Sequence, residues 1–311
     1  MDDTKRDGWK AAIALAPAAI MLLIFTFFPI INTITMSFME GFQLRPGAGL
    51  LAISNKGTFG FGAYRDVLID PVFRDALVNT LILVVISVPL TICISLLLAV
   101  ALNSIKKLQG LYQTVFFLPY VTNTIALGMV FSAMFGGINS GLINAIIKAF
   151  GGTAREWTTV NASKWDSLWV IIIYTVWNGL AFKILVFMSG LQSIDKQYYD
   201  AAKIDGTSKK RILWKITIPL LSPQILYITI TSFIGAFKSY TGIISVFGKG
   251  AYYFGGAGDD WITVVGYIYK QRNLAGAGQY AKASAGAVIL LIIILACTLV
   301  QNMIAKKRVH Y

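Results

Sequence analysis

The chain alternates between long runs of apolar residues and shorter segments rich in charged residues, glycine and aromatic residues. A helix needs about 20 mainly apolar residues to cross the hydrocarbon layer of a bilayer, where its own hydrogen bonds must satisfy the backbone. About six runs are long enough, namely 11–36, 77–102, 114–135, 168–190, 216–240 and 283–304. The pattern predicts an all-α, polytopic membrane protein with about six transmembrane helices, forming one transmembrane domain over residues 1–311.

Composition agrees with lipid as the main solvent. The chain is 56% hydrophobic and 13% charged, whereas soluble domains contain roughly 25% charged residues. A net charge of +13 would suit nucleic acid, but the lysines and arginines lie between the apolar runs, as in cytoplasmic membrane loops. We therefore expect membrane lipid and no nucleic acid as a partner. Cys93 and Cys297 both lie in apolar runs and are interpreted as small buried side chains rather than a disulfide.

The distribution of positive charge predicts the orientation in the membrane. An even number of spans places both termini on one side, and that side, with the segment 191–215, is the denser in Lys and Arg. Cytoplasmic loops carry this excess. We predict a multi-pass protein of the cell (inner) membrane with both termini in the cytoplasm. The longer Gly-rich loops at 40–76, 136–167 and 241–282 would lie outside, with short interfacial helices.

The segment 191–223 reads LQSIDKQYYDAAKIDGTSKKRILWKITIPLLSP. Ser193 or Asp195 can cap the start of a helix, and Gly206 can adopt the left-handed conformation that ends it. Thr207 or Ser208 can then cap a second helix with one apolar side. The local chemistry predicts a helix, a turn and a helix beneath the membrane, over residues 192–216.

This segment resembles the cytoplasmic loop of the permeases of binding-protein-dependent ABC importers. That loop follows the pattern E-A-A, three residues, G, nine residues, I-x-L-P. The matching positions here are Asp200, Ala201, Ala202, Gly206, Ile216, Ile218 and Pro219. All the spacings are kept, while Asp200 replaces Glu and Ile218 replaces Leu. A solvated basic loop is the alternative interpretation; it explains the charges but not the spacing.

Other segments resemble the carbohydrate branch of these permeases, and the first permease type within it. They are APAAIMLLIFTFFPI near the start, LVNTL at 77–81, FGGINSGLINAII at 135–147, YIYKQ at 267–271 and YAKASAGAVILLIIIL at 280–295. One departure is the missing Gly-Gly-Pro after the fifth span, where GKGAYYFGGAGDDW stands instead. We therefore expect the substrate or the external partner to differ from the commonest ones.

The resemblance implies a set of partners and a role for the loop. The partners are a second homologous permease subunit, two copies of an ATPase subunit, an extracytoplasmic substrate-binding protein and a sugar. The loop would be a coupling helix that docks on the ATPase, with Asp200, Ala201, Ala202, Gly206, Ile216 and Pro219 as its coupling residues. The chain contains no G-x-x-x-x-G-K-[ST] segment. We therefore expect no cofactor in this chain, ATP and Mg²⁺ being bound by the ATPase, and no catalytic or metal-binding residue.

Two lysines, Lys183 and Lys238, lie within or near the ends of predicted spans. A charge at the centre of a bilayer costs about 2.5–3.5 kcal/mol on insertion scales. One interpretation is that Lys238 reaches the outer interface. The other, which the resemblance implies, is that Lys238, Ser239 and Tyr240 line the substrate passage. An ammonium there would suit an anionic saccharide, and we hypothesise an acidic oligosaccharide as the substrate.

Three further residues are candidates for the passage because they offer hydrogen bonds and a stacking surface to a sugar. They are Asn123, Trp177 and Asn178. The alternative is helix packing by the amides and an aromatic belt at the interface.

Two other classes of protein compete with the permease. A membrane enzyme is disfavoured because the single histidine is His310, next to last, with no metal-ligand cluster. A secondary transporter or channel working without an ATPase would usually show internal inverted repeats, broken helices or buried ionisable pairs at mid-membrane, and none of these is evident in the sequence.

Overall fold

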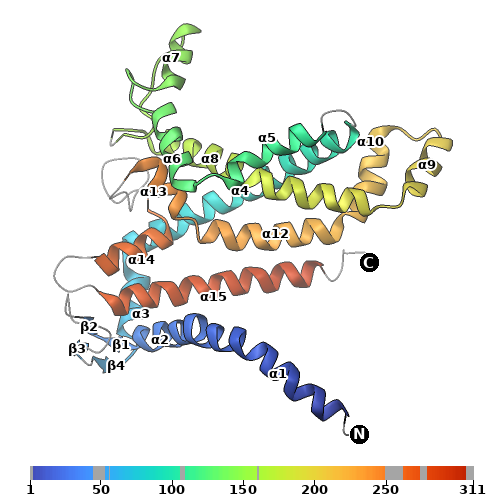
Figure 1. The fold of residues 1–311 in the computed structure, drawn as a ribbon. Helices are drawn as coiled ribbons and strands as arrows, with labels where there is room; N and C mark the ends of the chain where they lie inside the picture. The colour runs from blue at the N-terminus through green and yellow to red at the C-terminus, as the bar shows by residue number, and fades with distance from the viewer. Residues whose placement is uncertain are drawn as a thin grey trace. The chain divides into compact units, whose positions relative to one another are not determined.

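The computed structural model describes residues 3–44, 53–55, 57–105, 109–159, 161–248, 262–273 and 279–305. The segment 249–261 and His310 lie outside them. Helices make up most of the described chain (Figure 1), so the prediction of an all-α fold is confirmed. The chain packs as two compact units, residues 1–70 with 268–289, and residues 71–267 with 290–311. The interpretation of the whole chain as one permease domain stays a prediction.

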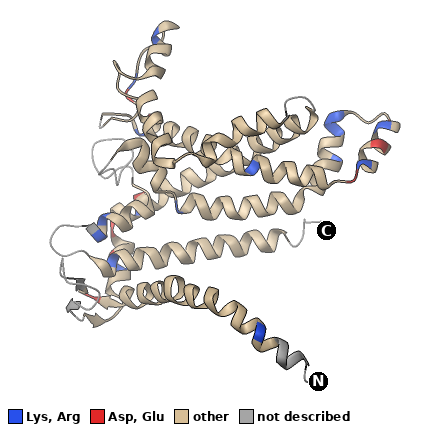
Figure 2. Ribbon diagram, in the orientation of Figure 1, with Lys and Arg blue, Asp and Glu red and all other residues tan. Residues whose placement is uncertain are grey.

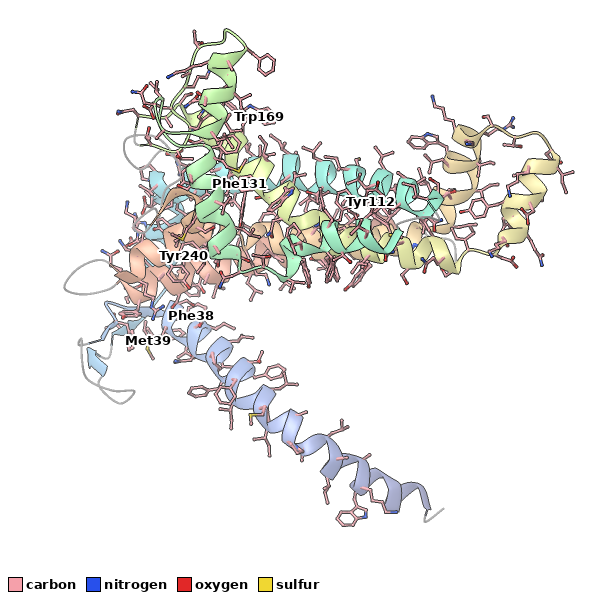
Figure 3. The ribbon with its side chains drawn as sticks, turned by 45° about the horizontal axis from the view of Figure 1, so that its top comes forward. Phe38, Met39, Tyr112, Phe131, Trp169 and Tyr240 are labelled. Atoms are coloured by element: carbon pink, nitrogen blue, oxygen red, sulfur yellow. The ribbon has the colours of Figure 1, made fainter. Side chains whose placement is uncertain are left out.

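The first unit begins with a long, apolar helical segment. It consists of α1 (Asp3–Leu22), the π-helix η1 (Leu23–Phe27) and α2 (Phe28–Ser37). Residues Gly8–Ser37 are long and apolar enough to cross a membrane. Most of their side chains are exposed, Phe25 by 71%, and Figure 3 shows side chains projecting along this helical segment. An apolar surface of this length is stable in lipid and not in water.

The first unit continues with small antiparallel strand pairs that the sequence did not predict. β1 (Met39–Glu40) pairs with β4 (Thr58–Phe59), and β2 (Gln43–Leu44) pairs with β3 (Ile53–Asn55). The ring of Phe38 packs on several aromatic rings, and the hydroxyls of Ser37 and Tyr64 lie 2.6 Å apart. Helix α3 (Gly62–Ile69) follows, and Asp66 in it pairs with Lys282 at 3.1 Å. Long-range strand pairing has no local sequence signal, which is why it was missed.

The second unit is built on two long helices, α4 (Pro71–Ser104) and α8 (Lys164–Ser193), which pack against each other. Helix α12 (Ser222–Phe237) packs on α4, and α13 (Thr241–Phe247) packs on α6 (Thr124–Met134). One core cluster surrounds Phe131 and Ile171, and a second surrounds Phe187 and Ile228. These helices run side by side in Figure 1, so side chains distant in sequence meet between them.

Two of the predicted spans are bent. The run 114–135 forms α5 (Gln109–Val121) and α6, with a 96° bend, and the run 216–240 belongs to segments 209–220 and 222–237, with a 69° bend. Proline has no backbone N–H to continue a helix, and Pro119 and Pro219 lie just before these bends. Four described helices are long and apolar enough to cross a membrane, or up to six if each bent pair is one span. The expectation of about six spans is therefore met only when the bent pairs are counted.

Shorter helices complete the two units. They are α7 (Leu142–Ala149), α9 (Lys196–Ile204), α10 (Lys209–Ile212), the π-helix η2 (Leu213–Thr217), α11 (Ile218–Leu220) and α14 (Val264–Asn273). The last helix, α15 (Tyr280–Ala305), has 26 residues and is one of the candidate spans. In the second unit, the amide of Asn79 donates to the Ile262 carbonyl at 3.1 Å, and the Val264 N–H donates to the Thr80 hydroxyl at 3.0 Å. These bonds fix the start of α14 on α4. The segments 40–76 and 136–167 do contain short helices, α3 and α7; their position outside the cell and at the membrane interface stays a prediction.

Candidate functional site: the loop of α9 and α10 and a cavity between helices

Helix α9 begins as the sequence predicts. Asp195 is its N-cap, and the carboxylate accepts a hydrogen bond from the Gln197 N–H at 2.9 Å. This bond satisfies one of the backbone donors that a helix leaves free at its start. Ser193, the other candidate cap, instead donates to the Gly190 carbonyl at 2.8 Å. The start of α9 is therefore fixed by a local interaction.

The turn after α9 is centred on Gly206, which has a φ of +66°. The Thr207 N–H bonds to the Ala202 carbonyl at 2.9 Å, and the Gly206 N–H bonds to the Lys203 carbonyl at 3.0 Å. This pair of bonds is a Schellman motif, which glycine favours because it has no Cβ. Ser208 then caps α10 by accepting from the Arg211 N–H at 3.4 Å. The predicted helix, turn and helix are confirmed.

The acidic position of the loop lies in solvent. Asp200 is exposed, and its carboxylate accepts a hydrogen bond from the Lys203 ammonium at 2.8 Å. This bond lowers the pKa of the Asp200 carboxyl below its ordinary value, and the charges of Lys203 and Lys196 add to the effect. An exposed pair of this kind contributes little to stability. Asp200 is therefore an ionised group available to a partner.

The two alanines of the motif have different surroundings. Ala202 is only 6% exposed, whereas Ala201 is exposed. An open cleft of about 790 Å³ lies between α9 and the segment from α10 to η2, lined by Asp195, Tyr198, Ala201, Arg211, Lys215 and Ile216. Pro219 follows in α11, just before the bend. The structure brings the predicted coupling residues to one end of the second unit, where Figure 2 shows charged segments gathered on α9 and α10.

Two residues of this loop were missed by the sequence analysis. The Tyr199 hydroxyl lies 3.3 Å from that of Thr217, so it joins α9 to η2 across the turn. Ile204 is 87% exposed at the end of α9. A bulky apolar side chain two residues before the turn glycine was a visible signal for Ile204. Nothing local in the sequence indicates the contact between Tyr199 and Thr217.

A cavity of about 380 Å³ lies between helices of the second unit. Polar side chains from four helices line it, together with Ser239, which follows α12. Those from α4 are Ser87 and Thr91, that from α6 is Thr124, those from α8 are Tyr174, Thr175 and Asn178, and those from α12 are Thr231 and Ser232. Hydroxyls and amides both donate and accept hydrogen bonds. Lys183 of α8 also lines this cavity.

The structure places two of the six predicted passage residues, Asn178 and Ser239, in the cavity wall. Lys238 is exposed at the C-cap of α12, and Tyr240 lies where the chain turns into α13 (Figure 3). Asn123 instead caps α6 by accepting from the Ile125 N–H at 2.8 Å. Trp177 lines a separate apolar pocket against α5, and its ring lies 5.4 Å from that of Phe131.

In the part of the chain that the structure describes, no group of three or more His, Cys, Asp or Glu side chains is arranged to hold a metal ion. The polar groups that line the cavity offer hydrogen bonds and one ammonium.

Residues 91–310 match the family model described as "Binding-protein-dependent transport system inner membrane component". The arabinooligosaccharides transport system permease protein AraP of Halalkalibacterium halodurans is 30% identical over 286 residues, covering 90% of this chain and 83% of the relative. The lactose transport system permease protein LacF of Rhizobium radiobacter is 32% identical, covering 97% and 95%.

Among solved structures, the chain resembles a subunit of a bacterial ABC transporter involved in the import of the acidic polysaccharide alginate. The TM-score is 0.79 at 20% identity, covering 98% of each chain. At this identity the likeness shows a shared fold.

Proposed function

Because the chain belongs to the family of binding-protein-dependent transport system inner membrane components, we propose that it is the permease subunit of an ATP-driven importer for a saccharide. Two relatives are permeases named for arabinooligosaccharides and lactose. The cavity supports the same substrate class, because its hydroxyls and amide match the hydrogen-bonding groups of a sugar. The apolar helices make it a multi-pass membrane protein.

The observation that carries the proposal is the preformed loop of α9, Gly206 and α10. A substrate channel alone has no need of it. We infer that the loop is the docking element for a separate ATPase, because its exposed side offers a carboxylate at Asp200, an apolar side chain at Ile204 and surrounding cations. ATP and Mg²⁺ are bound by that ATPase. A carboxylate and cations on one docking surface fix its orientation.

The same loop is joined to the helix that lines the cavity. Tyr199 contacts Thr217 of η2, and the chain then continues through α11 into α12. Thr231, Ser232 and Gly235 of α12 line the cavity. A displacement of α9 by the ATPase would therefore move one wall of the cavity. The two states of the ATPase make different contacts with α9, so each state favours a different arrangement of the helices. The cavity then opens to each side of the membrane in turn.

The remaining partners follow from this mechanism. One permease provides one half of a passage, so the importer contains a second homologous permease, two ATPase copies and an extracytoplasmic binding protein that delivers the saccharide. The orientation with α9 and both termini in the cytoplasm agrees with the Lys and Arg excess on that side.

Gly206→Pro tests the proposal, with Gly206→Asn as the matched control. Proline fixes φ near −65°, which is incompatible with the observed +66°, whereas asparagine tolerates a left-handed conformation. A side chain at Gly206 meets no atom within 4 Å, so the effect comes from the backbone. We expect Gly206→Pro to abolish ATP-dependent uptake in membrane vesicles at unchanged membrane level, and Gly206→Asn to retain most of it.

Two results would contradict the proposed function. One is full ATP-dependent uptake by Gly206→Pro. The other is transport by the purified chain in liposomes without an ATPase, which would make it a secondary transporter or channel.

A further inference from the structure

Lys183 lies within the membrane-spanning part of α8. The helix has 30 residues, which corresponds to a length of about 45 Å at about 1.5 Å per residue. Lys183 is about 15 Å from its C-terminal end by the same rise. A hydrocarbon core about 30 Å thick and centred on the helix would place the Lys183 Cα roughly 7 Å inside it. The residue therefore lies too deep to be treated as part of the interface.

The side chain of Lys183 points away from the nearer end of the helix. Its ammonium donates to the carbonyl of Gly179 at 3.1 Å, one turn toward the N-terminus. A Cβ at Gly179 would lie 3.0 Å from this nitrogen, so the glycine leaves the space that the ammonium occupies. A lysine that reaches for the nearer interface would extend in the opposite direction. The conformation instead holds the charge in the cavity wall.

No described carboxylate lies within salt-bridge distance of the Lys183 ammonium. An ammonium has three donors, and the structure gives it one hydrogen bond, to the Gly179 carbonyl. The rest of the cavity lining is uncharged. A charge inside the membrane is costly unless something pairs with it. The cavity thus offers a positive charge, next to hydroxyls and an amide, without a negative charge from the described chain.

We propose that Lys183 is a specificity-determining residue that selects saccharides bearing an anionic group, either a carboxylate or a phosphate. This rests on the proposed function as a saccharide permease. The oxyanion pairs with the ammonium, while Thr91 and Asn178 bond the sugar hydroxyls. The residue that the sequence analysis favoured for this role, Lys238, is not in the cavity wall. The hypothesis of an acidic substrate therefore depends on Lys183 and not on Lys238.

The test uses the complete importer in liposomes, with its partner permease, ATPase and binding protein. Three probes are compared: a uronic acid oligosaccharide, the same oligosaccharide with its carboxyl groups reduced to alcohols, and a sugar phosphate. Variant rates are divided by parent rates for each probe. Because one binding protein delivers every probe, this ratio isolates the permease.

We expect Lys183→Met to lower uptake of one anionic probe at least tenfold and to change uptake of the neutral probe less than twofold. The affected probe identifies carboxylate or phosphate as the selected group. Lys183→Arg keeps the charge and should retain most of the anionic uptake. Gly179→Ala keeps the lysine but places a methyl group against its ammonium, so a smaller, selective loss is expected. Lys238→Met should change anionic and neutral uptake by the same factor.

Three results would overturn the inference. They are equal losses for charged and neutral probes in Lys183→Met, an unchanged anionic rate in that variant, and a parent importer that carries only neutral sugars. Each leaves the saccharide permease intact. By contrast, uptake of a probe by the purified chain in liposomes without the ATPase would contradict the proposed function itself.

Discussion

The loop of α9 and α10 and the cavity between α4, α8 and α12 differ in how their geometry arises. Every bond that shapes the turn joins residues close in sequence, such as those around Asp195 and Gly206. The cavity instead collects side chains from positions as far apart as Ser87 and Ser239. Local chemistry determines the geometry of the loop that would contact the ATPase. The tertiary packing of helices determines the geometry of the cavity that would bind the substrate. If the loop and the cavity are mechanically coupled, substitutions in the loop should change transport through the cavity.

The largest effect is expected from a substitution at Ile204, which should weaken binding to the ATPase without unfolding α9. The side chain is 87% exposed, so Ile204→Asp should leave α9 folded while removing an apolar anchor from the ATPase contact. We expect at least a tenfold weaker affinity for the ATPase, corresponding to about 1.4 kcal/mol, measured by co-purification and titration in detergent. Ile204→Leu is the control, with affinity near that of the parent. Parent affinity in Ile204→Asp would remove this residue from the docking surface.

A smaller effect on transport is expected at the contact between Tyr199 of α9 and Thr217 of η2. Tyr199→Phe removes the hydroxyl that contacts Thr217, and one hydrogen bond contributes about 0.5–1.5 kcal/mol. We expect the ATPase to bind normally while uptake per ATP hydrolysed falls about two- to fivefold. The measurement compares sugar uptake with phosphate release in the same liposomes. An equal fall in ATPase binding would show that Tyr199 belongs to the docking surface rather than to transmission.

The smallest effect concerns pH. The Lys203 ammonium holds the pKa of the Asp200 carboxyl below its ordinary value, so the contribution of the ionised group is present above the unfolded pKa and is lost as pH falls through the lowered one. Between pH 8 and about 5, Asp200 stays charged. Lys203→Met should move the loss of charge to higher pH, as measured by carboxyl carbon NMR of the labelled protein. An unmoved titration would show that Lys203 does not set this pKa, and the effect should shrink in high salt.

The same contrast explains how much the sequence revealed. Spans, caps and the turn glycine could be predicted because apolar length, N-cap chemistry and the left-handed preference of glycine act locally. The sequence did not predict the strand pairs around Phe38 or the contact between Tyr199 and Thr217. It predicted straight spans where the structure has bends after Pro119 and Pro219. In the cavity, Asn178 and Ser239 were found. The conformation of Lys183 over Gly179 depends on helix packing and has no signature along the chain.

The central claim is that α9 faces the cytoplasm and contacts a separate ATPase. Cysteine introduced as Ala201→Cys, with Cys93 and Cys297 replaced by serine, tests it directly. Ala201 is exposed on α9, so a short thiol crosslinker should join it to the ATPase in inverted membrane vesicles, while a membrane-impermeant maleimide added to intact cells should leave it unlabelled. Labelling from outside intact cells, with no crosslink to the ATPase, would contradict the account.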